Sequence, residues 1–289
     1  MKPSRFAYHA PATVDECVAV LAEHGEEAKP LAGGQSLVPM MNLRLAAPAV
    51  LVDLNGIAEL SYVVDDGDVL AIGAMTRHRT VAGSDTVRAA NPLLVHAASL
   101  IGYPAIRVRG TIGGSLAHAD PVSELPCVAM TLDAHLVIAG PSGRRTLAAS
   151  DFFLGYFTTA VGPGELLVEV RFPRVGGETG WGFAELARKA GDYAVVAVAT
   201  AVTVRHGTIV SARIGLAGVA DRPVRATGAE EQLRGQPATA DSVAAAADAI
   251  SAQVTAEATR ELRFASHVAG VLGRRALTDA LERAGSTTP

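Results

Sequence analysis

The chain has 289 residues, of which 49% are hydrophobic and 4% aromatic, and it carries a formal net charge of −4. Such a chain can bury a sizeable core, as one compact unit or as two to three small domains. The mildly acidic balance and scattered arginines argue against nucleic acid or an anionic membrane as a partner. No apolar segment is long enough to cross a bilayer and no signal peptide is recognisable, so we expect a cytoplasmic protein.

Cysteine usage narrows the cofactor chemistry. Cys17 and Cys127 are the two cysteines of the chain, and neither belongs to a Cys-x-x-Cys motif. Two isolated cysteines cannot ligate an iron–sulfur cluster or a cysteine-based zinc ion. Buried reduced thiols are favoured in a chain expected in the cytoplasm, with a disulfide left open.

The first predicted unit covers residues 1–57 and has a β-α-β pattern. Thr13 and Glu16 form a capping box that begins a helix, and Gly25 fits the position just after its end. Two short strands and a helical turn complete the unit, at residues 29–32, 50–54 and 36–45. The first of these strands runs directly into a Gly-Gly pair.

The second predicted unit covers residues 58–176. We expect two hairpins, two helical regions and a closing strand, at residues 62–73, 135–147, 76–100, 123–132 and 166–172. The region 76–100 is interrupted near Asn91 and Pro92. Apolar and basic residues alternate from Ile106 to Thr111, which predicts a strand leading into a second Gly-Gly pair.

A linker at residues 173–178 precedes the third predicted unit, which covers residues 178–285. We expect three strands followed by two helices, at residues 182–188, 194–205, 209–217, 241–259 and 263–284. The turn at His206 and Gly207 makes the last two strands a hairpin. The predicted class is therefore α+β, ending in a three-stranded antiparallel sheet covered by helices.

The two Gly-Gly pairs are the most informative feature of the chain. They lie in Ala32-Gly33-Gly34-Gln35-Ser36 and in Thr111-Ile112-Gly113-Gly114-Ser115. Because glycine lets backbone N–H groups approach a ligand closely, each pair can form a nest for phosphate oxygens. The usual dinucleotide and P-loop motifs are absent, so two nests indicate a dinucleotide held from two sides. The alternative is a pair of ordinary glycine-rich turns.

Several other candidates have an ordinary structural explanation. His118 to Pro121 is favoured as a polar turn that caps the next helix over a metal site, because further ligands are absent. Glu124, in the first turn of that helix, can accept hydrogen bonds from ribose or ribityl hydroxyls, or only stabilise the helix. Arg77-His78-Arg79 is favoured as a solvated surface over a docking or phosphate site.

Tyr193 follows a charged turn at residues 188–192 and can place its phenol against a flat ring. We find no catalytic triad, carboxylate pair or activated cysteine in the sequence. Any chemistry is therefore expected to come from a cofactor.

Residues 31–45 and 109–121 resemble the two flavin motifs of the FAD-binding medium subunits of bacterial molybdenum hydroxylases. This family includes the medium subunits of carbon monoxide dehydrogenase, quinoline oxidoreductase and nicotine dehydrogenase. Residues 72–76 and 188–194 also match its pattern, and the resemblance covers nearly the whole chain.

The resemblance implies a two-subdomain FAD-binding fold of the vanillyl-alcohol-oxidase (PCMH) type, followed by a C-terminal α+β domain. It implies two partners, a small subunit with two [2Fe–2S] clusters and a large molybdopterin subunit, in a dimer of heterotrimers. Electrons would pass from the clusters through FAD to an external acceptor such as a quinone, NAD or oxygen. Through the complex, the protein could lie at the inner face of the membrane. The alternatives are a stand-alone flavin oxidoreductase of the same fold and a non-catalytic nucleotide-binding module.

Carried over position by position, the resemblance assigns FAD contacts to both glycine motifs and to a few residues beyond them. These are Leu31, Ala32, Gly33, Gly34, Gln35, Ser36, Leu37, Ile101, Thr111, Gly113, Gly114, Ser115, Glu124, Leu167 and Tyr193. Glu124 stands where many relatives have Asp, and Glu185 falls near a position that is often basic. No catalytic or metal-binding residue is assigned.

Overall fold

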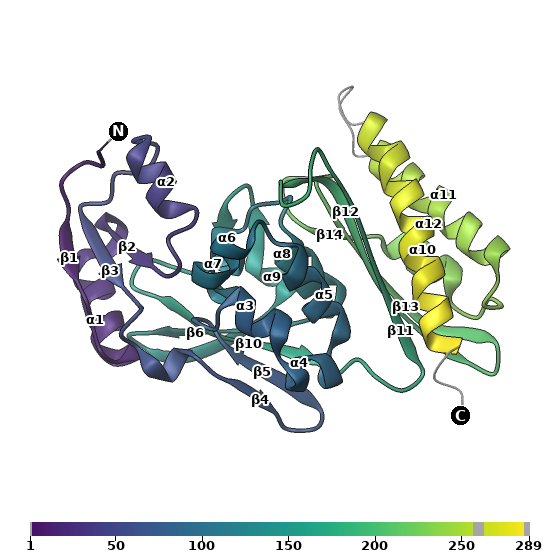
Figure 1. Ribbon diagram of the computed structural model, residues 1–289, viewed down its shortest axis with the longest axis horizontal. Helices are drawn as coiled ribbons and strands as arrows, with labels where there is room; N and C mark the ends of the chain where they lie inside the picture. Colours follow the sequence, from purple (N-terminus) through teal and green to yellow (C-terminus); the bar gives the residue numbers. More distant parts are fainter. Residues whose placement is uncertain (1, 257–262, 286–289) are drawn as a thin grey trace.

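The computed structural model describes residues 2–256 and 263–285, and it confirms the predicted α+β class. Within these residues the strands form sheets of three, five, four and two strands. The three larger sheets follow one another along the long axis of the molecule, in chain order (Figure 1). None of the helices in the described ranges combines the length and apolar character needed to span a membrane.

The N-terminal unit is a small parallel sheet beside one long helix. Its elements are β1 (Ala7–His9), α1 (Val14–His24), η1 (Gly25–Glu27), β2 (Ala28–Leu31), α2 (Leu37–Asn42) and β3 (Val50–Asp53). β3 lies between β1 and β2 and pairs parallel with both. The predicted helix is confirmed, since the Thr13 hydroxyl accepts from Glu16 N–H at 3.2 Å and Gly25 ends it. The short strand β1 was not predicted.

The middle unit packs a bundle of short helices against a five-stranded sheet. Its elements are η2 (Ala58–Leu60), β4 (Val63–Asp65), β5 (Val69–Gly73), α3 (His78–Gly83), α4 (Asp85–Ala90), α5 (Pro92–Leu100), α6 (Pro104–Arg109), α7 (Ile112–His118), α8 (Glu124–Thr131), β6 (His135–Gly140), β7 (Gly143–Ala148), α9 (Ala149–Phe152), β8 (Phe153–Gly155), β9 (Thr158–Thr159) and β10 (Leu166–Pro173). The sheet order is β4-β5-β10-β6-β7, with antiparallel neighbours throughout.

The predicted strand at 106–111 is wrong. Residues Pro104–Arg109 form the helix α6, and Gly110 is the C-cap just after it. Proline fits the first turn of a helix because its φ angle is already helical and its missing N–H is not needed there. Thr111 then caps the next helix, α7, so the second glycine pair lies within a helix and does not follow a strand.

The C-terminal unit is an antiparallel sheet covered on its outer face by long helices. Its elements are β11 (Thr179–Ala187), β12 (Ala194–Arg205), β13 (Thr208–Ala217), β14 (Val224–Arg225), α10 (Thr227–Leu233), α11 (Ala240–Ala256) and α12 (Arg263–Gly285). The three predicted strands are confirmed, and the two-residue β14 adds a fourth to the sheet. Residues 257–259 of the predicted helix lie outside the described residues.

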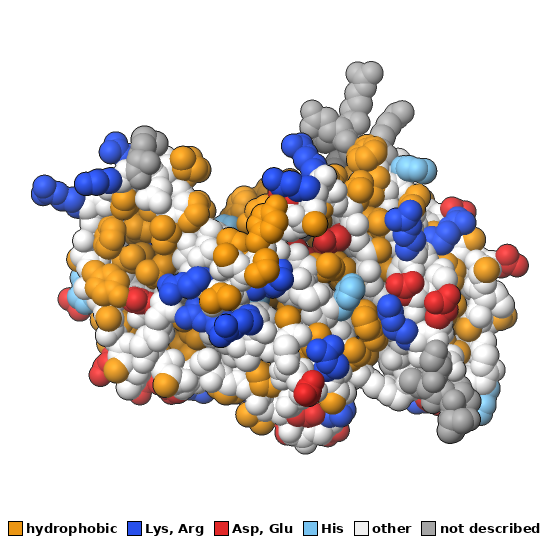
Figure 2. Space-filling view, viewed as in Figure 1, with side chains coloured by type: hydrophobic (Ala, Val, Ile, Leu, Met, Phe, Trp, Pro, Cys, Tyr) orange, Lys and Arg blue, Asp and Glu red, His pale blue; other side chains and the backbone are white. Residues whose placement is uncertain are grey.

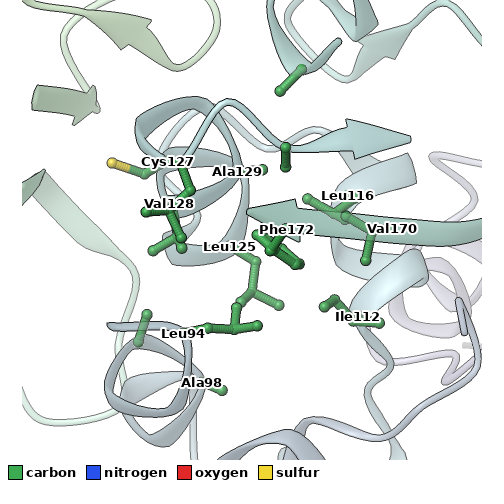
Figure 3. Packing of buried hydrophobic residues seen from close by; sticks show 14 of the residues in the cluster. Leu94, Ala98, Ile112, Leu116, Leu125, Cys127, Val128, Ala129, Val170 and Phe172 are labelled. Carbon is green, nitrogen blue, oxygen red and sulfur yellow. The ribbon is translucent and has the colours of Figure 1, made fainter. Parts of the chain in front are cut away.

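One core cluster joins the middle unit to the C-terminal sheet. Figure 3 shows its centre, where side chains of α5, α7, α8 and β10 meet: Leu94, Ala98, Ile112, Leu116, Leu125, Val128, Val170 and Phe172. The small residues Ala197 and Ala199 of β12 belong to this cluster. Their neighbours Val196 and Val198 point to the other face of the sheet and join the cluster of α11 and α12. The sheet is therefore buried on both faces.

The predicted linker at 173–178 is partly packed. Val175 is 2% exposed and its N–H donates to the carbonyl oxygen of Ala90 at 2.8 Å. The division into domains at 1–57, 58–176 and 178–285 stays a prediction.

Candidate functional site

A cavity of about 1000 Å³ opens between the N-terminal and middle units. The surface is visibly hollowed between these two parts of the molecule (Figure 2). Of the residues that the sequence singled out for FAD, all except Leu31 line it: Ala32, Gly33, Gly34, Gln35, Ser36, Leu37, Ile101, Thr111, Gly113, Gly114, Ser115, Glu124, Leu167 and Tyr193. Its volume is at the upper end of the range for ligand pockets, which suits a large ligand.

The first glycine motif is an open loop between β2 and α2. Gly34 has a φ of +72°, a conformation that glycine adopts without strain. In the described part of the chain, no protein group accepts a hydrogen bond from the backbone N–H of Gly33, Gly34 or Gln35. Gln35 Nε2 donates to the carbonyl oxygen of Gly33 at 3.0 Å, which fixes the loop. These N–H groups are available to an anionic ligand.

The second glycine motif differs from the predicted nest. The N–H of Gly113 donates to the carbonyl oxygen of Ala74 at 2.8 Å, and that of Gly114 to the Thr111 hydroxyl at 3.0 Å. Because both N–H groups have protein acceptors, the prediction of a second free nest is wrong. The glycine at 113 instead permits close packing, since a Cβ there would lie 2.4 Å from Ala74 Cβ.

The two motifs are in direct contact. A Cβ on Gly33 would lie 2.4 Å from the carbonyl oxygen of Arg109, and a Cβ on Gly114 would lie 3.4 Å from Ala32 Cβ. The glycine pairs therefore belong to a single site, with free donors on one side and a closely packed helix on the other.

Glu124 brings a buried carboxyl group to the cavity. It is the first residue of α8 and is 6% exposed. Burial raises its pKa to about 7, and the nearby Glu185 and Asp120 carboxylates also raise the pKa, while a backbone hydrogen bond opposes the shift. A carboxyl group with this pKa can both donate and accept hydrogen bonds near neutral pH.

Flat and apolar groups line other parts of the cavity. Tyr193 lies in the β11–β12 loop and is 56% exposed, and its phenol lines the cavity, where it is hydrogen-bonded to the side chain of Ser36 in the first glycine motif. Leu167 on β10 is 4% exposed, and Ile101 follows the end of α5. These residues come from the middle and C-terminal units, whereas the first glycine motif comes from the N-terminal unit.

Two sequence interpretations of nearby residues are settled by the geometry. A polar turn does follow α7, and in it Asp120 Oδ1 accepts from the N–H of Val122 at 3.1 Å. His118 is still the last residue of α7, and the predicted capping role is wrong, because Ser123 is the N-cap of α8 and no side chain of the described segments caps that helix. His78 contradicts the predicted solvated surface, because it is 5% exposed and lines the cavity, whereas Arg79 is exposed. Burial lowers the pKa of His78 to about 4, so the imidazole is neutral.

The sequence missed other residues of the cavity. Phe157 lies 5.1 Å from the His118 ring, centroid to centroid, and the turn at 162–165 also lines the cavity. The Gly-Pro-Gly signal at 162–164 could have predicted the turn, but no local signal predicts that it faces the glycine motifs.

Both cysteines and one acidic residue, Glu185, lie in buried or half-buried positions. Cys17 and Cys127 are free and buried in separate core clusters, which confirms the favoured interpretation. Glu185 on β11 is half-buried, and its Oε2 has no hydrogen-bond partner among the described residues. Burial raises the pKa of Glu185.

Family models match most of the chain. The model for the FAD binding domain in molybdopterin dehydrogenase matches residues 4–175. The model for the CO dehydrogenase flavoprotein C-terminal domain matches residues 181–280. The first match contains both glycine motifs, and the second contains Tyr193.

Individual relatives agree with these models. The chain is 42% identical to the carbon monoxide dehydrogenase medium chain of Hydrogenophaga pseudoflava, over 98% of this chain and 99% of the relative. A solved chain of carbon monoxide dehydrogenase from the same organism superposes with a TM-score of 0.93 at 44% identity, covering 98% and 99% of the two chains. A chain of quinoline 2-oxidoreductase from Pseudomonas putida 86 gives a TM-score of 0.90 at 35% identity, with both chains fully covered.

Proposed function

Because the chain belongs to the family of FAD-binding medium subunits of carbon monoxide dehydrogenase-type molybdenum hydroxylases, we propose that it is the electron outlet of such a complex. As a member of that family it is an oxidoreductase subunit. In the proposal, electrons reach FAD in the cavity from [2Fe–2S] clusters of a small partner subunit. They then leave for an external acceptor, which is a quinone, NAD or oxygen.

The observation that carries the proposal is the convergence of the two glycine motifs on one large cavity. The free N–H groups of Gly33, Gly34 and Gln35 suit diphosphate oxygens, which need several donors. A carboxyl group at Glu124 suits sugar or ribityl hydroxyls, and the exposed phenol of Tyr193 suits a flat ring. These residues therefore fit FAD.

Within this site, the protein would bind and orient FAD. When it is bound, FAD supplies the capacity to accept and release electrons. The first glycine loop would hold the diphosphate. Ile101 and Leu167 would exclude water from the cofactor, while Glu124 would exchange hydrogen bonds with hydroxyl groups at neutral pH. We assign no residue of this chain to oxidation of the organic or gaseous substrate.

The proposed assembly is a dimer of heterotrimers, each containing this chain, a small iron–sulfur subunit and a large molybdopterin subunit. Support for partner chains comes from two relatives that are named carbon monoxide dehydrogenase medium chains. The carbon monoxide dehydrogenase of Hydrogenophaga pseudoflava has been solved in a form that lacks the Mo-pyranopterin moiety of its molybdenum cofactor.

Flavin removal from the purified complex tests the electron path. We expect the complex without flavin to reduce its iron–sulfur clusters on addition of substrate, as seen by electron paramagnetic resonance. It should then fail to reduce the external acceptor until FAD is restored. Acceptor reduction at the full rate without flavin would contradict the proposal.

The isolated chain supplies the second measurement. We expect it to bind added FAD with the flavin absorbance of a bound chromophore, and to leave that absorbance unchanged when candidate organic substrates are added. Substrate-driven bleaching of the isolated chain would instead support a stand-alone flavin oxidoreductase.

A further inference from the structure

Arg77 lies where the two glycine motifs meet, and the cofactor proposal gives it no role. It is the residue before α3, and its backbone forms an antiparallel bridge with Thr111. Its guanidinium donates from Nη1 to the carbonyl oxygen of Arg109, beside the second motif. The same group donates from Nη2 to the side-chain oxygen of Asn55 at 2.6 Å. One side chain thus reaches toward both motifs.

Asn55 completes the connection to the first motif. Its Nδ2 donates to the carbonyl oxygen of Ala32 at 3.1 Å and also to the Asp53 carboxylate. The Asp53 carboxylate accepts the backbone N–H of Asn55 at 2.9 Å, which fixes the amide. The path therefore runs from Ala32 through Asn55 and Arg77 to Arg109, and we call it the Arg77–Asn55 bridge.

The second motif is also held by backbone hydrogen bonds to residues 76–78, which lead into α3. The N–H of His78 donates to the carbonyl oxygen of Gly110, and that of Ile112 to Thr76, both at 3.0 Å. The His78 ring meets the carbonyl oxygen of Thr111 at 2.8 Å from Nε2. These bonds hold only the second motif. The hydrogen-bonded connection from the second motif to Ala32 in the first motif runs through the Arg77–Asn55 bridge.

Arginine suits this position better than lysine. The planar guanidinium presents several donors in a rigid fork, so it can serve two acceptors in fixed directions. Burial lowers the pKa of Arg77, and the neighbouring Arg109 cation lowers it too, while Asp53 opposes the shift. A second cation this close is unfavourable. Both acceptors of the guanidinium, the Arg109 carbonyl and the Asn55 amide oxygen, are uncharged, so hydrogen bonds and not charge pairing hold the Arg77 side chain.

We propose that Arg77 is a positioning residue that, through Asn55, sets the separation of the two glycine motifs and so the affinity for FAD. The inference rests on the proposed function, because it takes the cavity as the FAD site. Arg77 need not touch the cofactor. Its effect would come from holding Ala32 and Arg109 at one spacing before the ligand arrives.

Three variants of the full chain test the inference: Arg77→Gln, Asn55→Ala and the double variant. The dissociation constant of FAD is measured by quenching of flavin fluorescence. Hydrogen bonds from a charged donor predict about a tenfold loss of affinity for each single variant. The double variant should be no weaker than the weaker single variant, because both substitutions break the same bridge. Without flavin, amide exchange should accelerate in residues 32–37 and 110–116.

Arg174→Gln is the matched control. Arg174 also joins a side chain and a backbone carbonyl, donating to Asp65 Oδ2 at 2.5 Å and to the Ala89 carbonyl oxygen at 3.5 Å, and it does not line the cavity. We expect it to leave FAD affinity and exchange at the glycine motifs unchanged. Arg77→Lys keeps the charge but not the fork, and should lose affinity like Arg77→Gln.

Each contrary result has a distinct meaning. If the wild-type chain does not bind FAD, the proposed function fails. If the wild-type chain binds and Arg77→Gln binds equally well, the inference is overturned. Full affinity in Arg77→Lys, or additive losses in the double variant, would also overturn it, because charge or an independent contact would then explain the effect.

Discussion

At Gly33 the backbones of the two motifs pack against each other with no room for a side chain. A Cβ there would lie 2.4 Å from the carbonyl oxygen of Arg109 and 2.8 Å from Gly110 Cα, both of them backbone atoms. Backbone cannot move aside as a flexible side chain can. Gly33→Ala should therefore push the motifs apart, lower the free energy of unfolding by about 1–3 kcal/mol, and weaken FAD binding more than about tenfold.

Chemical denaturation and flavin fluorescence quenching measure these two effects. Gly176→Ala is the control, because a Cβ on Gly176 has nothing within 4 Å and its φ is not positive. The explanation would be wrong if Gly33→Ala bound FAD as tightly as Gly176→Ala.

The Glu124 carboxyl makes stability depend on pH. Its pKa rises from 4.5 to about 7 on folding, because burial penalises the ionised form. As pH rises above 4.5, the unfolded chain loses this proton before the folded chain does. The free energy of unfolding should therefore fall between pH 4.5 and pH 7, by a total of about 3 kcal/mol, and level off above that window.

Glu124→Gln keeps the shape of the side chain without the ionisation. Denaturant titrations of the FAD-free protein at both ends of the window give the comparison. The difference in stability between Gln and Glu should grow in favour of Gln as the pH rises. A difference that stays constant with pH would show that the carboxyl is not the titrating group.

Helix α7 depends on one residue for its start. The Thr111 hydroxyl accepts the N–H of Gly114 at 3.0 Å, and Thr111 is 1% exposed. Loss of such a cap costs about 1 kcal/mol. Thr111→Ala should lower the free energy of unfolding by about this amount and speed amide exchange at Gly114. Thr111→Ser should restore both, and equal exchange in the alanine and serine variants would refute the capping role.

Local patterns predicted the long elements but not the short segment before α7. The segment 106–111 alternates between apolar and basic residues, which suits a strand, yet six residues are also too few to exclude a helix. Pro104 at the helix start was the better signal, because it reports backbone geometry directly. β1 and β14 have three and two residues, so only their pairing with β3 and β13 defines them.

Some residues of the site could be predicted from local sequence, and others could not. The loop at 32–36 was predictable because glycine and hydroxyl residues mark it locally. His78 was not, since its burial depends on packing against Gly110 and Thr111, more than 30 positions away. The free N–H groups of Gly33 and Gly34 match the expected nest, whereas those of Gly113 and Gly114 are taken by partners that no local pattern reveals.

At the scale of the whole molecule, the cavity draws on all three predicted units. The first glycine motif comes from the N-terminal unit, α7 and β10 from the middle unit, and residues 191–193 from the C-terminal unit. The core that stabilises α8 also contains Phe183, Ala194 and Ala217 from the C-terminal sheet. Removal of the C-terminal unit should therefore weaken FAD binding and destabilise the fold of the remaining units together.

A fragment of residues 1–176 tests this dependence. It removes Tyr193 from the cavity and uncovers the apolar faces of α5 and α8 that pack on β11, β12 and β13. We expect the fragment to bind the hydrophobic dye ANS, to unfold without a sharp thermal transition, and to lose FAD affinity more than about tenfold. Tyr193→Ala in the full chain separates the two causes, since it should weaken FAD binding while the thermal transition stays sharp. A fragment that unfolds cooperatively at the temperature of the full chain would show that the C-terminal sheet is a separate body, and that the shared core contributes little to stability.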